Sequence, residues 1–287
     1  MDSLGHFRGL FLGVGVGERL TLGYAPHPSQ SFMQSLLTWG QSQPSEKPPE
    51  QALMALLPTF LLGSDSPWQW QDYIRRGFSP QTDLEWHQTA QGLGAILVTI
   101  LADPMQSFLT VLPRSWAQLE AAGFGSLPIL ETVQTLLEQR VALMGAIAAL
   151  SPQPCPQPCP QGTDLPSTPT PSPEAIAVSP LTLLALACYT WLSTATHFHL
   201  SLQRARHIPA PRILPILVAA LSGFSNTARG IPPLDLLRLE TSNPLGQTDA
   251  QILTVAADRL YMQWAGIGAN PNVPLELLEV AIAPPDA

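Results

Sequence analysis

Residues 128–150 read PILETVQTLLEQRVALMGAIAAL. Apolar side chains recur in this stretch at steps of three and four residues. They are Ile129, Val133, Leu136, Leu137, Val141, Met144 and Ile147. That spacing puts them on one face of an α-helix, so Pro128–Leu150 predicts helix with one buried face.

The rest of the chain supports the same class. Gly92–Leu101 and Gln251–Trp264 share the helical spacing, and no window shows the sustained alternation of a strand. Capping residues precede a proline at Ser66-Pro67, Asp103-Pro104 and Ser179-Pro180, and capping-box spacing joins Thr248 to Gln251 and Ser115 to Gln118. The sequence therefore predicts an all-α protein.

Composition bears on where the protein acts. Only 12% of the 287 residues are charged and 45% are hydrophobic. The longest apolar runs, Gly94–Ala102 and Leu181–Leu192, are shorter than the ~20 residues that span a bilayer. Asp2 stands where a signal peptide would be basic, and three cysteines suit a reducing compartment. We expect a soluble, cytoplasmic protein with no membrane partner.

The charge pattern argues against nucleic acid as a partner. The net charge is −8, and the 13 basic residues form no stripe. The nearest approach to a basic patch is Arg204, Arg206, His207 and Arg212. Nucleic-acid binding needs a denser positive surface, so we expect none.

One composition change interrupts the chain. Residues 151–173 hold nine prolines, which fix φ and remove backbone donors. We expect a disordered, proline-rich insertion at 151–173, a flexible tail at 280–287, and a single helical domain over residues 1–287.

Three short motifs favour structural interpretations. Gly13–Gly17 lacks the spacing of a phosphate loop, so we favour a helix whose glycines allow close packing. Cys155 and Cys159 lack further ligands for zinc nearby and are interpreted as incidental thiols. His197 and His199 lack an evident carboxylate, and we favour helix-terminal polar roles over a metal pair. We predict no metal site.

An aromatic segment holds the densest titratable set. Asp72, Asp83, Glu85 and His87 lie among Trp68, Trp70, Tyr73, Phe78 and Trp86. Aromatic side chains at helical spacing are usually packing residues, and the four titratable residues are secondary candidates for chemistry.

Two segments resemble the ADP-ribosylglycohydrolase family. Residues 7–20, FRGLFLGVGVGERL, are similar to the family's opening helix, R-G-x-x-x-G-x-x-x-G-D-x-L-G. Arg8, Gly9, Gly13 and Gly17 match, whereas Glu18 stands where the family has aspartate. Residues 214–232 resemble the family's late helix, with its small-residue run and Ile-Pro turn, and residues 185–206 resemble the preceding helix pair of degenerate cyanobacterial members.

The metal motifs of that family are missing. Family enzymes hold two divalent cations with T-D-D-T and G-D-T-D-T motifs. Here the corresponding stretches are Pro26–Gln30 and His207–Arg212, and neither contains a carboxylate. Because magnesium needs several oxygen ligands, the positioned water and the charge stabilisation of the hydrolase would be lost.

The resemblance implies an ADP-ribosylglycohydrolase-like multi-helix orthogonal bundle without catalysis. We expect a module that binds a protein partner or an ADP-ribose-like small molecule and needs no cofactor. The expected ligand pocket lies between the two matching helices, at Glu18, Arg212, Ser222 and Asn226.

Two alternatives stay open. The first is an active hydrolase of ADP-ribosyl or related N-glycosidic bonds that uses Mg2+ and replaced ligands, for which Glu18, Asp72, Asp83 and Asn226 are the candidates. The second is a helical assembly protein without a ligand pocket, whose proline-rich segment is a linker or a docking strip.

Overall fold

The fold is built from helices, as the periodicity predicts. The computed structural model describes residues 3–22, 31–37, 47–64, 69–103, 107–151, 178–240 and 247–266, and these residues contain no strand. The elements in chain order are α1 (Ser3–Leu22), α2 (Phe32–Leu37), α3 (Pro49–Leu62), α4 (Trp70–Gly77), α5 (Leu84–Ala102), η4 (Phe108–Thr110), α6 (Val111–Ala121), α7 (Pro128–Glu138), α8 (Leu143–Leu150), α9 (Pro180–Leu192), α10 (Phe198–His207), α11 (Ile213–Asn226), η5 (Ala228–Gly230), α12 (Pro233–Leu236), η6 (Leu237–Leu239) and α13 (Asp249–Trp264). The all-α prediction is confirmed.

Four helices form the interior. Helices α1, α5, α9 and α11 are apolar on nearly every side, and most of their residues are buried. A helix without a polar face must be covered on all sides, so the other helices pack around these four. One continuous hydrophobic cluster extends from Phe7 in α1 to Leu260 in α13.

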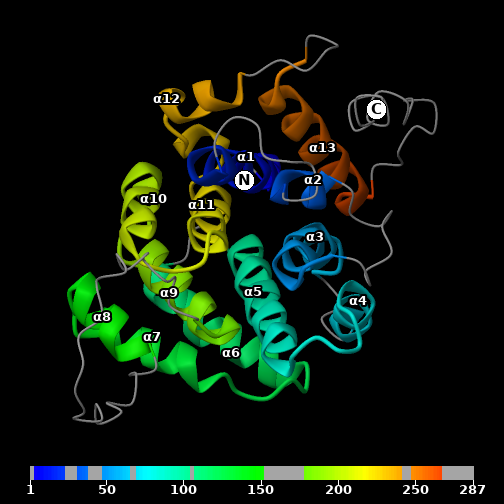
Figure 1. The fold of residues 1–287 in the computed structure, drawn as a ribbon. Coiled ribbons are helices and arrows are strands. Elements are labelled where there is room, and N and C mark those ends of the chain that lie inside the picture. The colour runs from blue at the N-terminus through cyan, green and yellow to red at the C-terminus, as the bar shows by residue number, and fades with distance from the viewer. Residues whose placement is uncertain are drawn as a thin grey trace, which may run out of the picture.

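Helix α1 is the hub that places the candidate site. It packs against α11, α13, α2, α12 and both short helices η5 and η6. Figure 1 shows α1 in the upper middle of the view, with α11 below it, α12 above it and α13 to its right. Segments from the two ends of the described chain therefore meet around one helix.

Two of the predicted helix starts are confirmed. Ser179 caps α9, where its hydroxyl accepts from the Thr182 N–H at 3.3 Å and Pro180 follows at the first helical position. Thr248 and Gln251 form the predicted capping box of α13. Ser66-Pro67 lies outside the described residues.

Of the other two predicted starts, the one at Ser115 with Gln118 is wrong, and the one at Asp103-Pro104 runs into residues outside the described ranges. Asp103 itself ends α5, and its carboxylate accepts from Arg114 at 2.7 Å. Ser115 lies inside α6, where its hydroxyl donates to the Val111 carbonyl at 2.8 Å. The Ser115 hydroxyl therefore bonds to a carbonyl of its own helix and does not cap a helix start, so its spacing to Gln118 is incidental.

The stretch 128–150 is two helices, because α7 ends in a Schellman motif. The N–H of Val141 donates to the Leu136 carbonyl, the N–H of Arg140 donates to the Leu137 carbonyl, and Arg140 has φ 51°. This left-handed residue closes the end of α7, so α8 begins as a separate helix at Leu143. The predicted buried face therefore fails at Met144, whose side chain is 72% exposed.

Two sequence predictions concern segments that are described only in part or not at all. The proline-rich stretch lies outside the described residues apart from Ser151, and residues 280–287 lie outside them entirely.

Among the described helices, none has the length and apolarity needed to cross a membrane.

Candidate functional site

The two helices that carry the family resemblance pack through their small residues. A Cβ atom on Gly9 would lie 2.0 Å from the Gly223 carbonyl oxygen, and one on Gly13 would lie 2.3 Å from the Ala219 carbonyl oxygen. Gly17 approaches Ile216 in the same way, with 2.9 Å from its Cβ position to the Cα atom. The glycines therefore bring two backbones together, and Gly13–Gly17 is part of α1 and follows no strand.

This packing separates the residues of the expected ligand pocket. Because Gly17 meets Ile216 and Gly9 meets Gly223, α1 and α11 run antiparallel. Glu18 lies near the N-terminal end of α11, which begins directly after Arg212. Asn226 is ten residues beyond Ile216, or about 15 Å along the helix at its normal rise. The structure does not bring Glu18 together with Ser222 and Asn226.

Ser222 and Asn226 fasten the far end of α11. Ser222 is fully buried, and its hydroxyl accepts from the Asn226 amide at 3.2 Å. The same amide donates to the Ala195 carbonyl at 2.7 Å, in the turn between α9 and α10. These bonds connect α11 to that turn. Arg212, in contrast, is exposed at the start of α11.

Glu18 is a buried carboxylate that caps a neighbouring helix. Its side chain is almost fully covered, and Oε1 accepts from the Ser31 hydroxyl at 2.7 Å. Its other oxygen accepts from the N–H of Met33 in the first turn of α2. Glu18 therefore satisfies a donor that α2 cannot satisfy itself and joins α2 to α1.

The environment of Glu18 shifts its proton affinity. Burial raises the pKa of Glu18 above its ordinary value of 4.5, and the hydrogen bonds from Met33 and Ser31 and the charge of Arg19 oppose that rise. The nearby Asp249 carboxylate adds to the rise in pKa. The carboxylate is thus stabilised by donors from its own chain while it is poorly hydrated.

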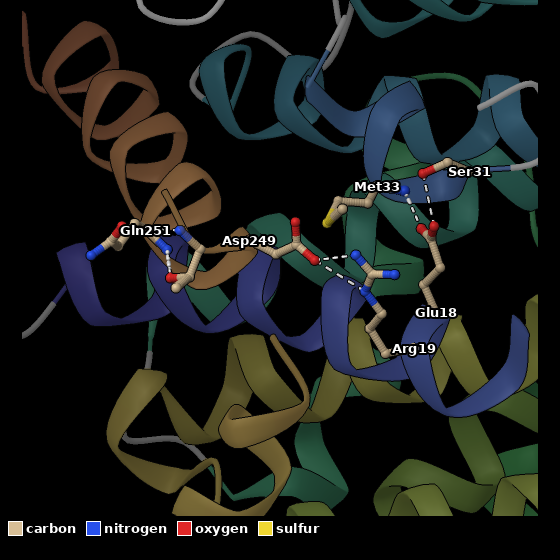
Figure 2. Close-up of polar contacts among 7 residues, drawn as sticks. Glu18, Arg19, Ser31, Met33, Asp249 and Gln251 are labelled. Carbon is tan, nitrogen blue, oxygen red and sulfur yellow. Dashed lines mark hydrogen bonds and ion pairs between the residues drawn. The ribbon is translucent and has the colours of Figure 1, made fainter. Parts of the chain in front are cut away.

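Beside Glu18, Arg19 connects α1 to α13. The Nε atom of Arg19 donates to Asp249 at 3.0 Å, and a second nitrogen of the guanidinium reaches the same oxygen. Both side chains are close to 90% covered. Figure 2 shows Glu18 directed toward α2 and Arg19 directed toward Asp249, beside the capping box of Gln251. The three charged residues form a polar junction of α1, α2 and α13.

The secondary candidates lie on the surface of α4 and at the start of α5. Asp72 is exposed and pairs with Arg75 on its own helix at 3.5 Å. Asp83 is exposed before α5, and its side chain makes no capping bond. Glu85 is half-buried. The ring of His87 packs on Phe78, with 5.1 Å between centroids. The described contacts do not bring these four residues into one reactive group.

The histidine pair has separate roles. His197 precedes α10 at its N-cap position. His199 lies 3.0 Å from the buried Asp235 carboxylate of α12, a partner that is distant in sequence. Cys155 and Cys159 lie outside the described residues. Within the described part of the chain, no three His, Cys, Asp or Glu side chains gather in a way that could hold a metal ion.

One cavity was not anticipated from the sequence. It has a volume of about 480 Å³ and opens beside the start of α13, between Leu12, Leu236 and Glu240. Thr248 and Gln251 also line it, but their side chains are used in the capping box. No local signal in the sequence marks this cavity, because α1 and the region around the start of α13, far apart in the chain, form it together.

Comparisons of the chain with protein-family models, with curated proteins and with solved structures found no match.

Proposed function

We propose that the chain is an interaction module, built on an ADP-ribosylglycohydrolase-like orthogonal bundle, that does not perform metal-dependent hydrolysis. The observation that supports this proposal most strongly is that the Glu18 carboxylate is occupied in capping α2. Both oxygens of the carboxylate accept hydrogen bonds that hold α2 against α1.

The residues that match the family's helices hold α1 and α11 together in this chain. Gly9, Gly13 and Gly17 from the first segment face Ala219 and Gly223 from the second. The small residues that match the family therefore have a packing role in this chain. That role needs no metal and no substrate, so it is compatible with a bundle that has kept its architecture without the chemistry.

The surroundings of Glu18 disfavour a magnesium site. Magnesium takes oxygen ligands in near-octahedral geometry and keeps several waters. To serve as a ligand, Glu18 would have to release the Ser31 hydroxyl and the Met33 N–H from a buried position. The nearby Asp249 is already held by Arg19. A hydrolase that used Glu18 or Asp249 as a metal ligand would need to break this junction.

Calorimetry tests this proposal directly. The full chain is titrated with Mg2+ and then with ADP-ribose, with and without the metal, and Glu18→Gln is the matched control. We expect no micromolar binding of Mg2+ and no effect of the metal on ADP-ribose affinity. Micromolar Mg2+ binding that strengthens ADP-ribose binding and is lost in Glu18→Gln would overturn the proposal in favour of the hydrolase.

A further inference from the structure

Positive charge is concentrated in one part of this acidic chain. The sixty residues Ala175–Leu234 contain no Asp or Glu but hold four arginines and three histidines. All 21 acidic residues lie outside that stretch. A chain of net charge −8 therefore has one segment of opposite sign, which is where an acidic partner would be attracted.

Three of the four arginines gather around the connection from α10 to α11. We call Arg204, Arg206, His207 and Arg212 the basic turn. Arg206, His207 and Arg212 are exposed, and Arg204 is half-buried with a 3.2 Å bond to the Ser193 hydroxyl. The basic turn thus presents its charge to solvent from two adjacent helix ends.

The connection that carries Arg212 is short and restrained. Pro209 and Pro211 fix their own φ angles, and the N–H of Ala210 donates to the Ile208 carbonyl at 2.8 Å. Ile208 is buried and anchors the connection to the core. The basic side chains therefore project from a backbone that loses little freedom on binding.

Within the described residues, these arginines are not neutralised by ion pairs. Five other arginines each pair with an aspartate: Arg8, Arg19, Arg75, Arg114 and Arg238. Among the described residues, no carboxylate forms an ion pair with Arg204, Arg206 or Arg212. Over the described ranges, therefore, no acidic side chain of the protein offsets their charge.

Helix electrostatics explain only part of the basic turn. Cations in the last turn of a helix complement its dipole, which accounts for Arg204, Arg206 and His207 at the end of α10. Arg212 stands at a helix N-terminus, directly before α11, where the helix dipole disfavours a cation. Arg212 and the α11 dipole therefore add to the positive potential, and stability of α11 alone does not account for an arginine there.

We propose that the basic turn docks an acidic segment of a partner protein, through glutamate or aspartate side chains. This inference rests on the interaction-module proposal and specifies its partner. The planar guanidinium groups match carboxylates in a bidentate manner. Nucleic acid fits less well, because four basic residues neutralise few phosphates while the rest of the chain is repelled by them.

A labelled peptide of eight glutamates is the probe, with a glutamine peptide of equal length as its control. The full chain at low salt is expected to bind the glutamate peptide saturably, with binding weakened on adding salt. The double variant Arg206→Glu with Arg212→Glu is expected to lose about tenfold or more in affinity. Arg75→Glu with Arg76→Glu, which changes charge equally in the last turn of α4, is expected to bind as the wild type does.

Three results would overturn the inference. Equal peptide binding by both double variants would place any binding elsewhere. Tighter binding of a single-stranded DNA oligonucleotide than of the peptide, lost with Arg206 and Arg212, would make nucleic acid the partner. Displacement of the peptide by millimolar inorganic phosphate would leave a simple anion site. None of these results depends on Mg2+ or ADP-ribose, so they leave the absence of hydrolysis to be judged separately.

Discussion

Gly9 and Gly223 meet backbone to backbone, so closely that a Cβ atom on either would lie within 2.2 Å of the other's carbonyl oxygen. This contact fixes the spacing of α1 and α11 at one end of their packed length, while Gly17 and Ile216 meet at the other end, beside Glu18 and Arg19. Backbone atoms cannot move aside as a flexible side chain can, so the spacing of the two helices depends on both glycines.

Gly9→Ala is therefore expected to destabilise the protein by about 3 kcal/mol or more, at the upper end of overpacking penalties. Urea unfolding followed by circular dichroism measures the change. Gly145→Ala on the exposed side of α8 is the matched control: its new methyl would lie 2.9 Å from Cγ1 of Val141, so one half-buried side chain has to shift rather than a backbone, and helix propensity improves. A Gly9→Ala protein as stable as the control would show that the two backbones are not in contact.

Glu18 predicts a specific dependence of stability on pH. Its folded-state pKa is raised above the ordinary 4.5, mainly by burial, so the folded state binds the proton more tightly than the unfolded state. Glu18 therefore contributes stability below pH 4.5 that is lost as pH rises through the raised pKa. Glu18→Gln retains an acceptor for Met33 without the buried charge, and should be at least as stable as the wild type at pH 7.

The comparison is made by urea unfolding of both proteins at several values between pH 7 and pH 4.5. We expect the advantage of Glu18→Gln to shrink as the pH falls, because the wild-type carboxylate becomes protonated. An advantage that grows on acidification would mean that the pKa of Glu18 is lowered in the folded state.

The two ion pairs between α1 and α13 should differ in importance. Arg19 and Asp249 are almost fully covered, whereas Arg8 and Asp258 are about one-third exposed. Asp249→Ala leaves the Arg19 charge buried without this partner and should cost about 3–5 kcal/mol. Asp258→Ala should cost about 1 kcal/mol or less, because solvent screens the exposed pair. Thermal unfolding at matched pH ranks the two variants, and equal losses would contradict the difference in burial.

Asn226 should matter for stability through the turn after α9. Asn226→Ala removes the donor to the Ala195 carbonyl and the bond to Ser222, and we expect a loss of about 1–3 kcal/mol. Asn226→Asp, which has acceptors where the amide donates, should be destabilised as well. Chemical unfolding measures both, and two neutral results would mean that the Ala195 carbonyl is satisfied in another way.

The sequence predicted local features well and distant contacts poorly. The all-α class, the Ser179 cap and the Thr248 capping box depend on neighbouring residues, and all three are confirmed. The packing role of Gly13–Gly17 was predicted, but its partner on α11 was not inferred from spacing alone. Small residues at Ala219 and Gly223, four apart like Gly9 and Gly13, are the signal that could have paired the two helices.

The missed features depend on backbone reversals and on tertiary contacts. Arg140 ends α7 in a left-handed conformation that usually favours glycine. Because no glycine marks this position, the apolar spacing of residues 128–150 gave no sign that one helix ends there. The role of Glu18 depends on Met33 N–H, fifteen residues away, and that of Arg19 depends on Asp249 near the other end of the chain. Neither partner follows from periodicity or capping rules.

The most direct test of the central claim is hydrogen exchange at the Met33 amide, which reports whether Glu18 caps α2 or binds metal. We predict slow exchange in the wild type that is unchanged by 10 mM Mg2+ (a concentration of the order that saturates weak magnesium sites), retained in Glu18→Gln and lost in Glu18→Ala. Faster exchange on adding Mg2+ to the wild type, absent in Glu18→Gln, would show that the carboxylate leaves α2 for a metal ion and would contradict the account.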